Sequence, residues 1–248
     1  MKQYGLIGYP LTHSFSKRYF TEKFETAKID SVYSNYEIDS ITRFPEVIAS
    51  NPELIGLNVT IPYKEKVIPY LDDLNDSARE IGAVNTVKIT RTENGIKLKG
   101  FNTDTHGFEN SLKPLLKPHH TKALILGTGG ASKALKYVLK KLGIEFISAS
   151  IEELKENEIR YGDIDEKVIS ERLLIINATP LGTYPKVEGC PDIPYQYLAS
   201  DHLLFDLVYN PEVTRFMSLG LEKGATVKNG YEMLLLQAEK SYAIWNEE

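Results

Sequence analysis

Hydrophobic and polar residues alternate along the first hundred residues in short runs, which predicts strands separated by helices. Strands are predicted at residues 4–7, 32–38 and 56–61, and a helix at 15–29. The runs AVNTVKI and GIKLKGF flank Asn94-Gly95, a pair that supplies the positive φ angles of a tight hairpin turn. The pattern therefore predicts βαβ units joined to a hairpin, and so a mixed sheet.

A second unit with the same alternation follows the proline-containing segment 113–122, and a helix is predicted just before it at 105–116. ALILGTGGASKALKYVLKKLG predicts a strand, a glycine turn and an amphipathic helix. The later runs RLLIINA and HLLFDLVY are almost uniformly apolar, as strands covered on both faces are. The chain ends in a predicted packed helix, with apolar side chains at helical spacing at Tyr231, Leu234, Leu235, Ala238, Tyr242 and Trp245.

Composition and charge narrow the class of protein. The 248 residues are 42% hydrophobic and 25% charged, and no apolar run is long enough to cross a bilayer, so a globular α/β protein is expected. A net charge of -5 without a dense basic cluster argues against a nucleic-acid partner. The single Cys190 excludes an internal disulfide, no Cys/His spacing suggests a metal site, and no signal peptide is recognisable. We therefore expect a cytoplasmic protein that acts on a small molecule, with no membrane partner.

The segment Gly127-Thr-Gly-Gly-Ala-Ser132 lies between a predicted strand and a predicted helix, the context that a dinucleotide-binding turn requires. Gly127 permits the tight turn, Gly129 lets the backbone approach the pyrophosphate, and the helix N-terminus offers N–H groups to the anion. Ser132 occupies the third fingerprint position in place of glycine, and a plain strand-to-helix turn is the alternative. After the next predicted strand, Ser150-Ile-Glu152 supplies neither the usual acid nor an arginine, so these residues leave NAD and NADP open.

Polar residues gather at three predicted strand ends of the first unit. Thr60 lies on one predicted strand and Lys64 follows it, Asn85 begins another strand, and residues 102–104 end the hairpin. Because the strand ends of an open α/β sheet face the binding crevice, these residue types can form a site. The alternatives are that Lys64 is an ordinary solvated charge and that Asn102 or Asp104 only caps the following helix.

Two further segments carry polar groups that secondary structure alone does not readily explain. Ser14 and Ser16 lie at the start of the helix predicted at 15–29, where capping accounts for one of them but not for both. Gln237 lies on the last helix one turn after Met233 and Leu234, an awkward place for an amide without a partner. Surface exposure is the alternative for Gln237.

The chain resembles the shikimate dehydrogenase family through eight blocks in the family's order, which are YPLTHSFS, LNVTIPYKEKV, GAVNTV, FNTDTHGF, LGTGGASKA, NATPLG, DLVYNP and NGYEMLLLQA. The resemblance implies reversible, NADPH-dependent reduction of 3-dehydroshikimate to shikimate, in aromatic amino acid (chorismate) biosynthesis. It implies a mixed α/β substrate-binding domain at 1–104, completed by the C-terminal helix 231–248, and a Rossmann-type NADP-binding domain at 105–230, with the active site in the cleft between them. We expect a monomer or a homodimer.

The resemblance also implies roles for single residues. It makes Lys64 the catalytic lysine and Asp104 its partner, since reduction of a ketone by hydride needs a positioned acid for the developing alkoxide. The implied substrate-binding residues are Ser14, Ser16, Thr60, Asn85, Tyr209 and Gln237, with Asn58 in support. The implied cofactor-binding residues are Gly127, Gly129, Gly130, Ala131, Asn177, Leu207 and Gly230, while Asp206 is expected to be structural.

The chain departs from the family pattern in two places. Ser150-Ile-Glu152 stands where NADP-preferring members usually carry Asn-Arg-Thr, which leaves Lys155 or Arg160 as candidate ligands of the 2′-phosphate. The chain is also short for the family, and residues 151–172 are charged with weak periodicity, so we expect elements to be trimmed there. The alternative functions are a quinate/shikimate dehydrogenase that prefers NAD, a non-catalytic relative that binds the nucleotide or the acid, and a folate-pathway dehydrogenase of similar build.

Overall fold

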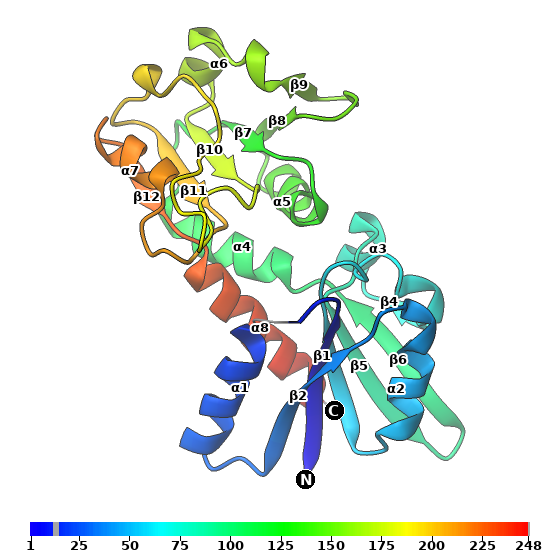
Figure 1. The fold of residues 1–248 in the computed structure, drawn as a ribbon. Helices are drawn as coiled ribbons and strands as arrows, with labels where there is room; N and C mark the ends of the chain where they lie inside the picture. Colours follow the sequence, from blue (N-terminus) through cyan, green and yellow to red (C-terminus); the bar gives the residue numbers. More distant parts are fainter. Residues whose placement is uncertain (12–14, 248) are drawn as a thin grey trace. The chain divides into compact units, whose positions relative to one another are not determined.

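The computed structural model describes residues 1–11 and 15–247, and the chain divides into two compact units (Figure 1). Unit 1 comprises Met1–Thr103 and Ala238–Glu248, and unit 2 comprises Asp104–Gln237. The last helix, α8 (Tyr231–Asn246), therefore begins in unit 2 and ends in unit 1. Each unit contains its own six-stranded sheet. None of the helices in the described part of the chain is long and apolar enough to span a bilayer.

Unit 1 is built on a mixed sheet. Its elements in chain order are β1 (Lys2–Gly8), α1 (Phe15–Thr26), β2 (Ser31–Glu37), α2 (Phe44–Ser50), β3 (Leu54–Val59), β4 (Asp73–Leu74), α3 (Asp76–Ile81), β5 (Thr86–Thr92) and β6 (Gly95–Phe101). The strand order is β2-β1-β3-β5-β6-β4, with β1 parallel to β2 and β3, and with β5 antiparallel to β3 and β6. The predicted mixed sheet and hairpin are confirmed, although Gly95 alone of the Asn94-Gly95 pair has a positive φ angle.

Apolar side chains cover both faces of this sheet, which explains why β1 and β3 are buried almost along their whole length. One face packs under α1 and the end of α8, where the aromatic residues include Tyr4, Phe20 and Trp245. Gly56 on β3 is required there, because a Cβ at this position would overlap the Trp245 indole ring. The indole Nε1 donates to the Val87 carbonyl on β5 at 3.0 Å, so the end of α8 is fixed to the sheet.

Unit 2 is built on a wholly parallel sheet. Its elements in chain order are α4 (Asp104–Leu112), β7 (Lys122–Leu126), α5 (Gly130–Lys141), β8 (Glu145–Ser150), β9 (Glu158–Arg160), α6 (Glu166–Glu171), β10 (Leu174–Asn177), β11 (Leu203–Asp206), α7 (Arg215–Leu221) and β12 (Thr226–Lys228), before α8. The strand order β12-β11-β10-β7-β8-β9 is that of the doubly wound dinucleotide-binding fold, in which the strand order reverses between β7 and β10. The predicted Rossmann-type fold is confirmed.

The connection between β8 and β9 is shorter than this fold usually has. The described residues 151–157 contain no helix, although β8 and β9 pair in parallel and such pairs are ordinarily joined through a helical crossover. The sequence-based expectation of trimmed elements in this part of the chain therefore agrees with the structure.

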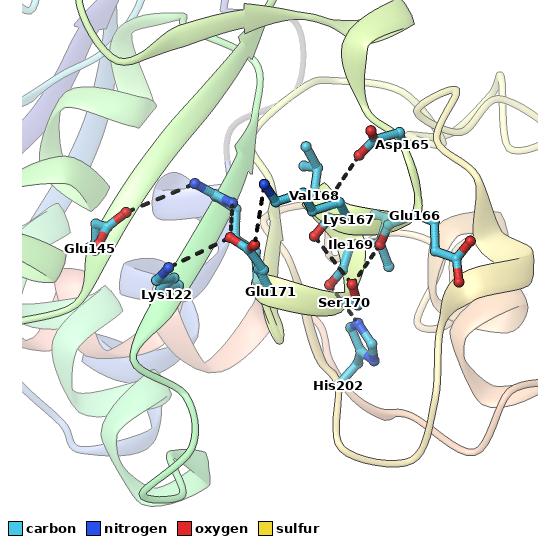
Figure 2. Close-up of polar contacts among 11 residues, drawn as sticks. Lys122, Glu145, Asp165, Glu166, Lys167, Val168, Ile169, Ser170, Glu171 and His202 are labelled. Carbon is cyan, nitrogen blue, oxygen red and sulfur yellow. Dashed lines mark hydrogen bonds and ion pairs between the residues drawn. The ribbon is translucent and has the colours of Figure 1, made fainter.

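The short helix α6 lies in the weakly periodic part of the sequence and is held by polar contacts (Figure 2). The Asp165 carboxylate caps it by accepting a hydrogen bond from the Val168 N–H at 2.9 Å. His202, just before β11, donates from Nε2 to the Ile169 carbonyl at 3.1 Å. Since a capping side chain and a side chain distant in sequence hold this helix, hydrophobic periodicity alone does not predict it.

The last helix buries part of the predicted face, since Ala238 and Trp245 are buried and Tyr242 packs beside them, but its first predicted residue is exposed. Tyr231 is 45% exposed, whereas Gln237 and Ser241 are buried. Near its start, α8 packs closely against α4, because Gly107 has no side chain that would overlap the Met233 carbonyl. The predicted packed helix is thus confirmed, but its buried face carries polar groups that belong to the networks described below.

Candidate functional site

The strand ends of unit 1 carry the predicted catalytic lysine and two of the predicted substrate-binding residues. Thr60 directly follows β3, Lys64 lies in the turn after it, and Asn85 directly precedes β5. Because β5 runs antiparallel to β3, its beginning lies at the same edge of the sheet as the end of β3. The Val59 N–H donates to the Asn85 carbonyl at 2.8 Å and fixes this arrangement.

The turn that carries Lys64 is anchored on both sides. The Lys64 carbonyl accepts a hydrogen bond from the Val84 N–H at 2.7 Å, which ties it to the residue before Asn85. The neighbouring Tyr63 is buried, and its hydroxyl donates to the Ile38 carbonyl at 2.6 Å. Lys64 itself is half-buried. A lysine held in this way is placed at the strand edge rather than carried on a loose surface loop.

The Asn85 side chain is oriented by the hydrogen bonds that its oxygen accepts. The Thr103 N–H donates to Asn85 Oδ1 at 2.7 Å, and the hydroxyls of Thr103 and Thr86 lie 3.2 Å and 3.1 Å from the same oxygen. These bonds join the start of β5 to the residue after β6. They also fix the backbone directly before Asp104, which is the first residue of α4.

Asn58 supports this edge from within the sheet. Its buried side chain donates from Nδ2 to Ser241 Oγ at 3.1 Å and to the Asn85 carbonyl at 3.2 Å. Its Oδ1 accepts a hydrogen bond from the Tyr33 hydroxyl at 2.8 Å. Burial raises the pKa of Tyr33 well above its ordinary value, so this phenol remains a neutral donor. The geometry agrees with the supporting role expected for Asn58.

The two serines of the HSFS segment differ in what the structure describes. Ser14 lies outside the described residues. Ser16 lies in the first turn of α1, is half-buried, and forms a hydrogen bond with Tyr33. Through Tyr33 it is connected to Asn58 and so to the same polar edge.

Three hydroxyl groups complete this network, and none of them was predicted as a site residue. The Ser241 hydroxyl lies 2.8 Å from that of Thr86 and 3.1 Å from that of Thr103, and all three residues are buried. Thr86 and Thr103 could have been found, since each directly adjoins a named site residue. Ser241 gave no signal, because a serine in a helical pattern is ordinarily exposed.

In unit 2, the glycine turn has the geometry that a dinucleotide requires. Gly127 follows β7 with φ +101°, and a Cβ there would lie 2.9 Å from Thr179 Cγ2, so the position demands glycine. A Cβ built on Gly129 or Gly130 would meet no atom within 4 Å among the described residues. The backbone at the N-terminus of α5 therefore faces open space, with Ala131 next in the helix, and an anion can approach it. Ser132, at the third fingerprint position, donates to the Gly129 carbonyl at 2.7 Å.

Replacing Gly127 with valine is expected to weaken dinucleotide binding about tenfold and to lower the free energy of unfolding by about 1–3 kcal/mol, through backbone strain and contact with Thr179. Quenching or enhancement of NADPH fluorescence measures the dissociation constant. Gly143→Val is the matched control, since Gly143 also has a positive φ angle, +70°, but a Cβ there meets no described atom within 4 Å. An unchanged dissociation constant for Gly127→Val would contradict the assignment of this turn.

Three predicted cofactor residues lie together beside the ends of β10 and β11. Asn177 ends β10, and its carbonyl accepts the Leu207 N–H at 3.0 Å. Gly230 packs on Leu207 so closely that a Cβ would overlap the Leu207 carbonyl oxygen. The Asn177 side chain is buried, and its Oδ1 accepts hydrogen bonds from the N–H and the hydroxyl of Thr179 at 3.0 Å and 2.6 Å.

Asp206 ends β11, and it is the only acidic residue that is buried in the described part of the chain. Burial raises the pKa of Asp206 to about 6, and hydrogen bonds from Thr214, Val208 and Asn177 partly oppose this rise. The bond between the carboxylate and the Val208 N–H, 3.0 Å long, turns the chain directly after the strand. This is why β11 is shorter than the apolar run HLLFDLVY suggested.

The remaining predicted substrate residues belong to unit 2. Tyr209, in the loop after β11, is 38% exposed. Gln237 is buried on α8, and its Nε2 donates to the Leu234 carbonyl at 2.9 Å, so the alternative of surface exposure is excluded. The substrate roles of these residues, and of Asp104 as partner of Lys64, stay predictions.

The segment that departs from the pattern of NADP-preferring members begins at the last residue of β8. Ser150 is buried, its hydroxyl accepts the Glu152 N–H at 3.1 Å, and it lies 3.5 Å from the Thr128 hydroxyl in the glycine turn. Lys155 and Arg160 are exposed. Their contact with a phosphate also stays a prediction. Within residues 1–11 and 15–247, no group of three or more His, Cys, Asp or Glu side chains is arranged to hold a metal ion.

Comparison with known proteins agrees with this architecture. A family model described as the shikimate dehydrogenase substrate binding domain matches residues 6–87. The NADP(+) shikimate dehydrogenase of Halothermothrix orenii is 38% identical over 97% of this chain and 89% of its own length. Shikimate dehydrogenase from Aquifex aeolicus has 33% identity and a TM-score of 0.84, covering 99% of this chain and 92% of that one. Shikimate 5-dehydrogenase from Thermus thermophilus, solved in complex with NADP(H) and shikimate, has 28% identity and a TM-score of 0.83, covering 99% and 94%.

One unit has a doubly wound sheet with an open glycine turn, and the other is an α/β unit that carries a polar strand edge. These two features place the chain in the class of two-unit nucleotide-dependent α/β proteins. Within that class, the chain belongs to the shikimate dehydrogenase family. The resemblance drawn from the eight sequence blocks is thereby confirmed.

Proposed function

We propose that this chain catalyses the reversible, NADPH-dependent reduction of 3-dehydroshikimate to shikimate, a step of aromatic amino acid biosynthesis. The observation that carries the proposal is the anchored Lys64 beside Asn85 at the strand edge of unit 1, in a chain whose other unit has a dinucleotide-binding turn. The relatives named above as shikimate dehydrogenases, one of them in complex with NADP(H) and shikimate, support it.

In the proposed mechanism, hydride passes from the reduced nicotinamide to the carbonyl carbon of 3-dehydroshikimate. The carbonyl oxygen gains negative charge, and the Lys64 ammonium donates a proton to it, so that an alcohol and a neutral amine result. In the reverse direction the neutral amine removes the proton from the alcohol. We assign Asp104 the role of acidic partner, supported by its position directly after Thr103, which binds Asn85.

The substrate carries a carboxylate and ring hydroxyls, which are bound by hydroxyl and amide groups. We propose that Ser14 and Ser16 bind the carboxylate, and that Thr60, Asn85, Tyr209 and Gln237 bind the carboxylate or the ring hydroxyls. The fixed orientation of the Asn85 amide supports this, since a preoriented group loses less entropy when substrate binds.

We further propose that unit 1 is the substrate-binding domain and that unit 2 binds NADP. The match of residues 6–87 to the substrate-domain family model supports the first assignment. The open backbone at Gly129 and Gly130 supports the second. As the assembly we propose a monomer or a homodimer, and as the compartment the cytoplasm, which the single cysteine favours.

A second candidate is an NAD-preferring quinate/shikimate dehydrogenase. It is favoured by the Ser150-Ile-Glu152 segment, where an arginine that would suit a 2′-phosphate is absent and the acid Glu152 is followed by a second acid, Glu153. Lys155 and Arg160 lie further along the chain, and both are exposed. They are our candidates for binding the phosphate.

The test is the growth of nicotinamide absorbance when purified protein is mixed with shikimate or quinate and with NADP or NAD. We expect turnover of shikimate with NADP. Turnover with NAD alone, or a preference for quinate, would replace the first candidate with the second. If no pair reacts while shikimate or NADP still raises the melting temperature, the chain is a binding protein and both candidates are wrong.

A further inference from the structure

The carboxylate of Asp206 is bound by three groups from three different segments of unit 2. Its Oδ1 accepts hydrogen bonds from Asn177 Nδ2 at 2.9 Å and from the Val208 N–H at 3.0 Å. Its Oδ2 accepts one from the Thr214 hydroxyl at 2.6 Å. These donors lie at the end of β10, in the loop after β11 and at the N-cap of α7. A single buried side chain therefore fixes the relative positions of both loops that follow the central strands.

Asn177, which is fixed by Asp206, in turn forms hydrogen bonds with residues of both loops. Its Oδ1 holds the Thr179 N–H and hydroxyl, and its own carbonyl accepts the Leu207 N–H at 3.0 Å. Thr179 in turn lies against Gly127, since a Cβ on that glycine would come within 2.9 Å of Thr179 Cγ2. Displacement of Asn177 would thus move Leu207 and Thr179 together.

Thr214 completes the arrangement on the other side of the carboxylate. Its hydroxyl donates to Asp206 and accepts the Met217 N–H at 3.3 Å, which caps α7. The loop from Leu207 to Thr214 is therefore held at both ends by the same carboxylate. Tyr209 lies within this loop.

An apolar residue would be the simpler choice for a fully buried position, because burial of a carboxylate is costly even when it is hydrogen-bonded. Leucine in place of Asp206 would, however, leave buried donors on Asn177 and Thr214 without their acceptor. The carboxylate thus determines the shape of the loops at some cost in stability.

The doubly wound fold assigns the two halves of a dinucleotide to the two sides of the point where the strand order reverses, here between β7 and β10. The pyrophosphate meets the glycine turn, and the adenosine ribose meets the end of the next strand, β8. The nicotinamide half then falls to the side of β10 and β11, whose loops Asp206 holds.

We propose that Asp206 is a positioning residue for the nicotinamide half of the dinucleotide, acting through Asn177 and the loop from Leu207 to Tyr209, and that binding of the adenosine half does not depend on it. This inference rests on the proposed function, because it concerns the same reaction. It assigns Asp206 more than the structural role expected from the sequence.

The experiment compares Asp206→Asn, Thr214→Val and Thr214→Ser with the unaltered protein. Asp206→Asn has the same shape but cannot accept all three hydrogen bonds, Thr214→Val removes one of them, and Thr214→Ser retains it. Ser148→Ala is the control for a buried polar change elsewhere in the same sheet, since the Ser148 hydroxyl is buried and has no hydrogen-bond partner among the described residues. For each variant we would measure kcat, the dissociation constant of NADPH by its fluorescence, and that of 2′,5′-ADP, the adenosine half alone, by competition.

We expect Asp206→Asn to lower kcat and weaken NADPH binding about tenfold or more, while the constant for 2′,5′-ADP changes less than about twofold. Thr214→Val should follow it in direction, whereas Thr214→Ser and Ser148→Ala should resemble the unaltered protein. If Asp206→Asn fails to fold, the test is the difference in kcat and in NADPH affinity between Thr214→Val and Thr214→Ser.

An equal loss of affinity for NADPH and 2′,5′-ADP, or an unchanged kcat in both Asp206→Asn and Thr214→Val, would overturn the proposal. A purely structural role would lower the melting temperature and leave the ratio of the two dissociation constants unchanged. If the unaltered protein does not oxidise shikimate, the proposed function fails, but the two binding constants still test the role of Asp206.

Discussion

Replacing Lys64 with alanine is expected to lower kcat for shikimate oxidation by about 10²–10⁴ and to change KM little, as removal of a general acid and base does. Steady-state kinetics with NADP measure both constants. The fold should be retained, because the hydrogen bond that anchors this turn is accepted by the Lys64 backbone carbonyl, which alanine keeps. The melting temperature is therefore expected to stay within about a degree or two of that of the unaltered protein.

Two further variants separate proton transfer from charge alone. Lys66→Ala removes a lysine that is exposed and lies two positions further along the same turn, and it should leave kcat unchanged. Lys64→Arg keeps a positive charge but supplies a group that does not lose its proton at accessible pH, so it should remain close to Lys64→Ala. A Lys64→Ala protein with undiminished kcat, or a Lys64→Arg protein with full activity, would remove Lys64 from the proposed mechanism.

The parts of the fold that the sequence predicted well are those in which burial is local and continuous. The apolar runs of unit 2 became β10 and β11, and the strand, turn and helix around Gly127 were placed almost to the residue, because each has a pattern typical of one structure only. The mixed sheet of unit 1 followed from the hairpin and the preceding βαβ pattern.

The parts that escaped prediction depend on contacts between distant residues. Helix α6 is held by Asp165 and by His202, which lies far along the chain, and its own periodicity is weak. Ser241 meets Thr86 only after α8 has packed on the sheet of unit 1. In the same way, burial of Tyr231 was predicted from helical spacing alone, whereas at the start of α8 the close approach of α4 at Gly107 places Met233 inward and leaves Tyr231 exposed.

In the candidate site, too, some residues could be predicted from local sequence and others depend on contacts between distant segments. Lys64, Thr60 and Asn85 were found because polar residues beside apolar strands stand out in a sequence. The groups that orient them do not, since a threonine in a strand is ordinary and its partner is fixed only by strand pairing. Asp206 was recognised but undervalued, because its three hydrogen-bond donors come from segments that a linear pattern does not connect.

Replacing Asn58 with alanine is expected to lower the free energy of unfolding of unit 1 by about 3 kcal/mol. The change removes the acceptor of the buried Tyr33 hydroxyl and the donor to Ser241, and it leaves a cavity between β3 and α8. Trp245 is the only tryptophan of the chain and is buried in unit 1, so its fluorescence during urea denaturation reports on this unit directly.

Asn51→Ala is the matched control, since Asn51 lies in the same unit, is half-buried, and donates to the Val47 carbonyl at the end of α2. It should cost about 1 kcal/mol or less. Because Asn58 also donates to the Asn85 carbonyl, its loss should raise KM for shikimate more than it lowers kcat, which is the opposite of the result expected for Lys64. Equal costs for the two asparagine variants, with KM unaltered, would show that the buried network neither stabilises unit 1 nor positions Asn85, and the account of the substrate edge given above would fail with it.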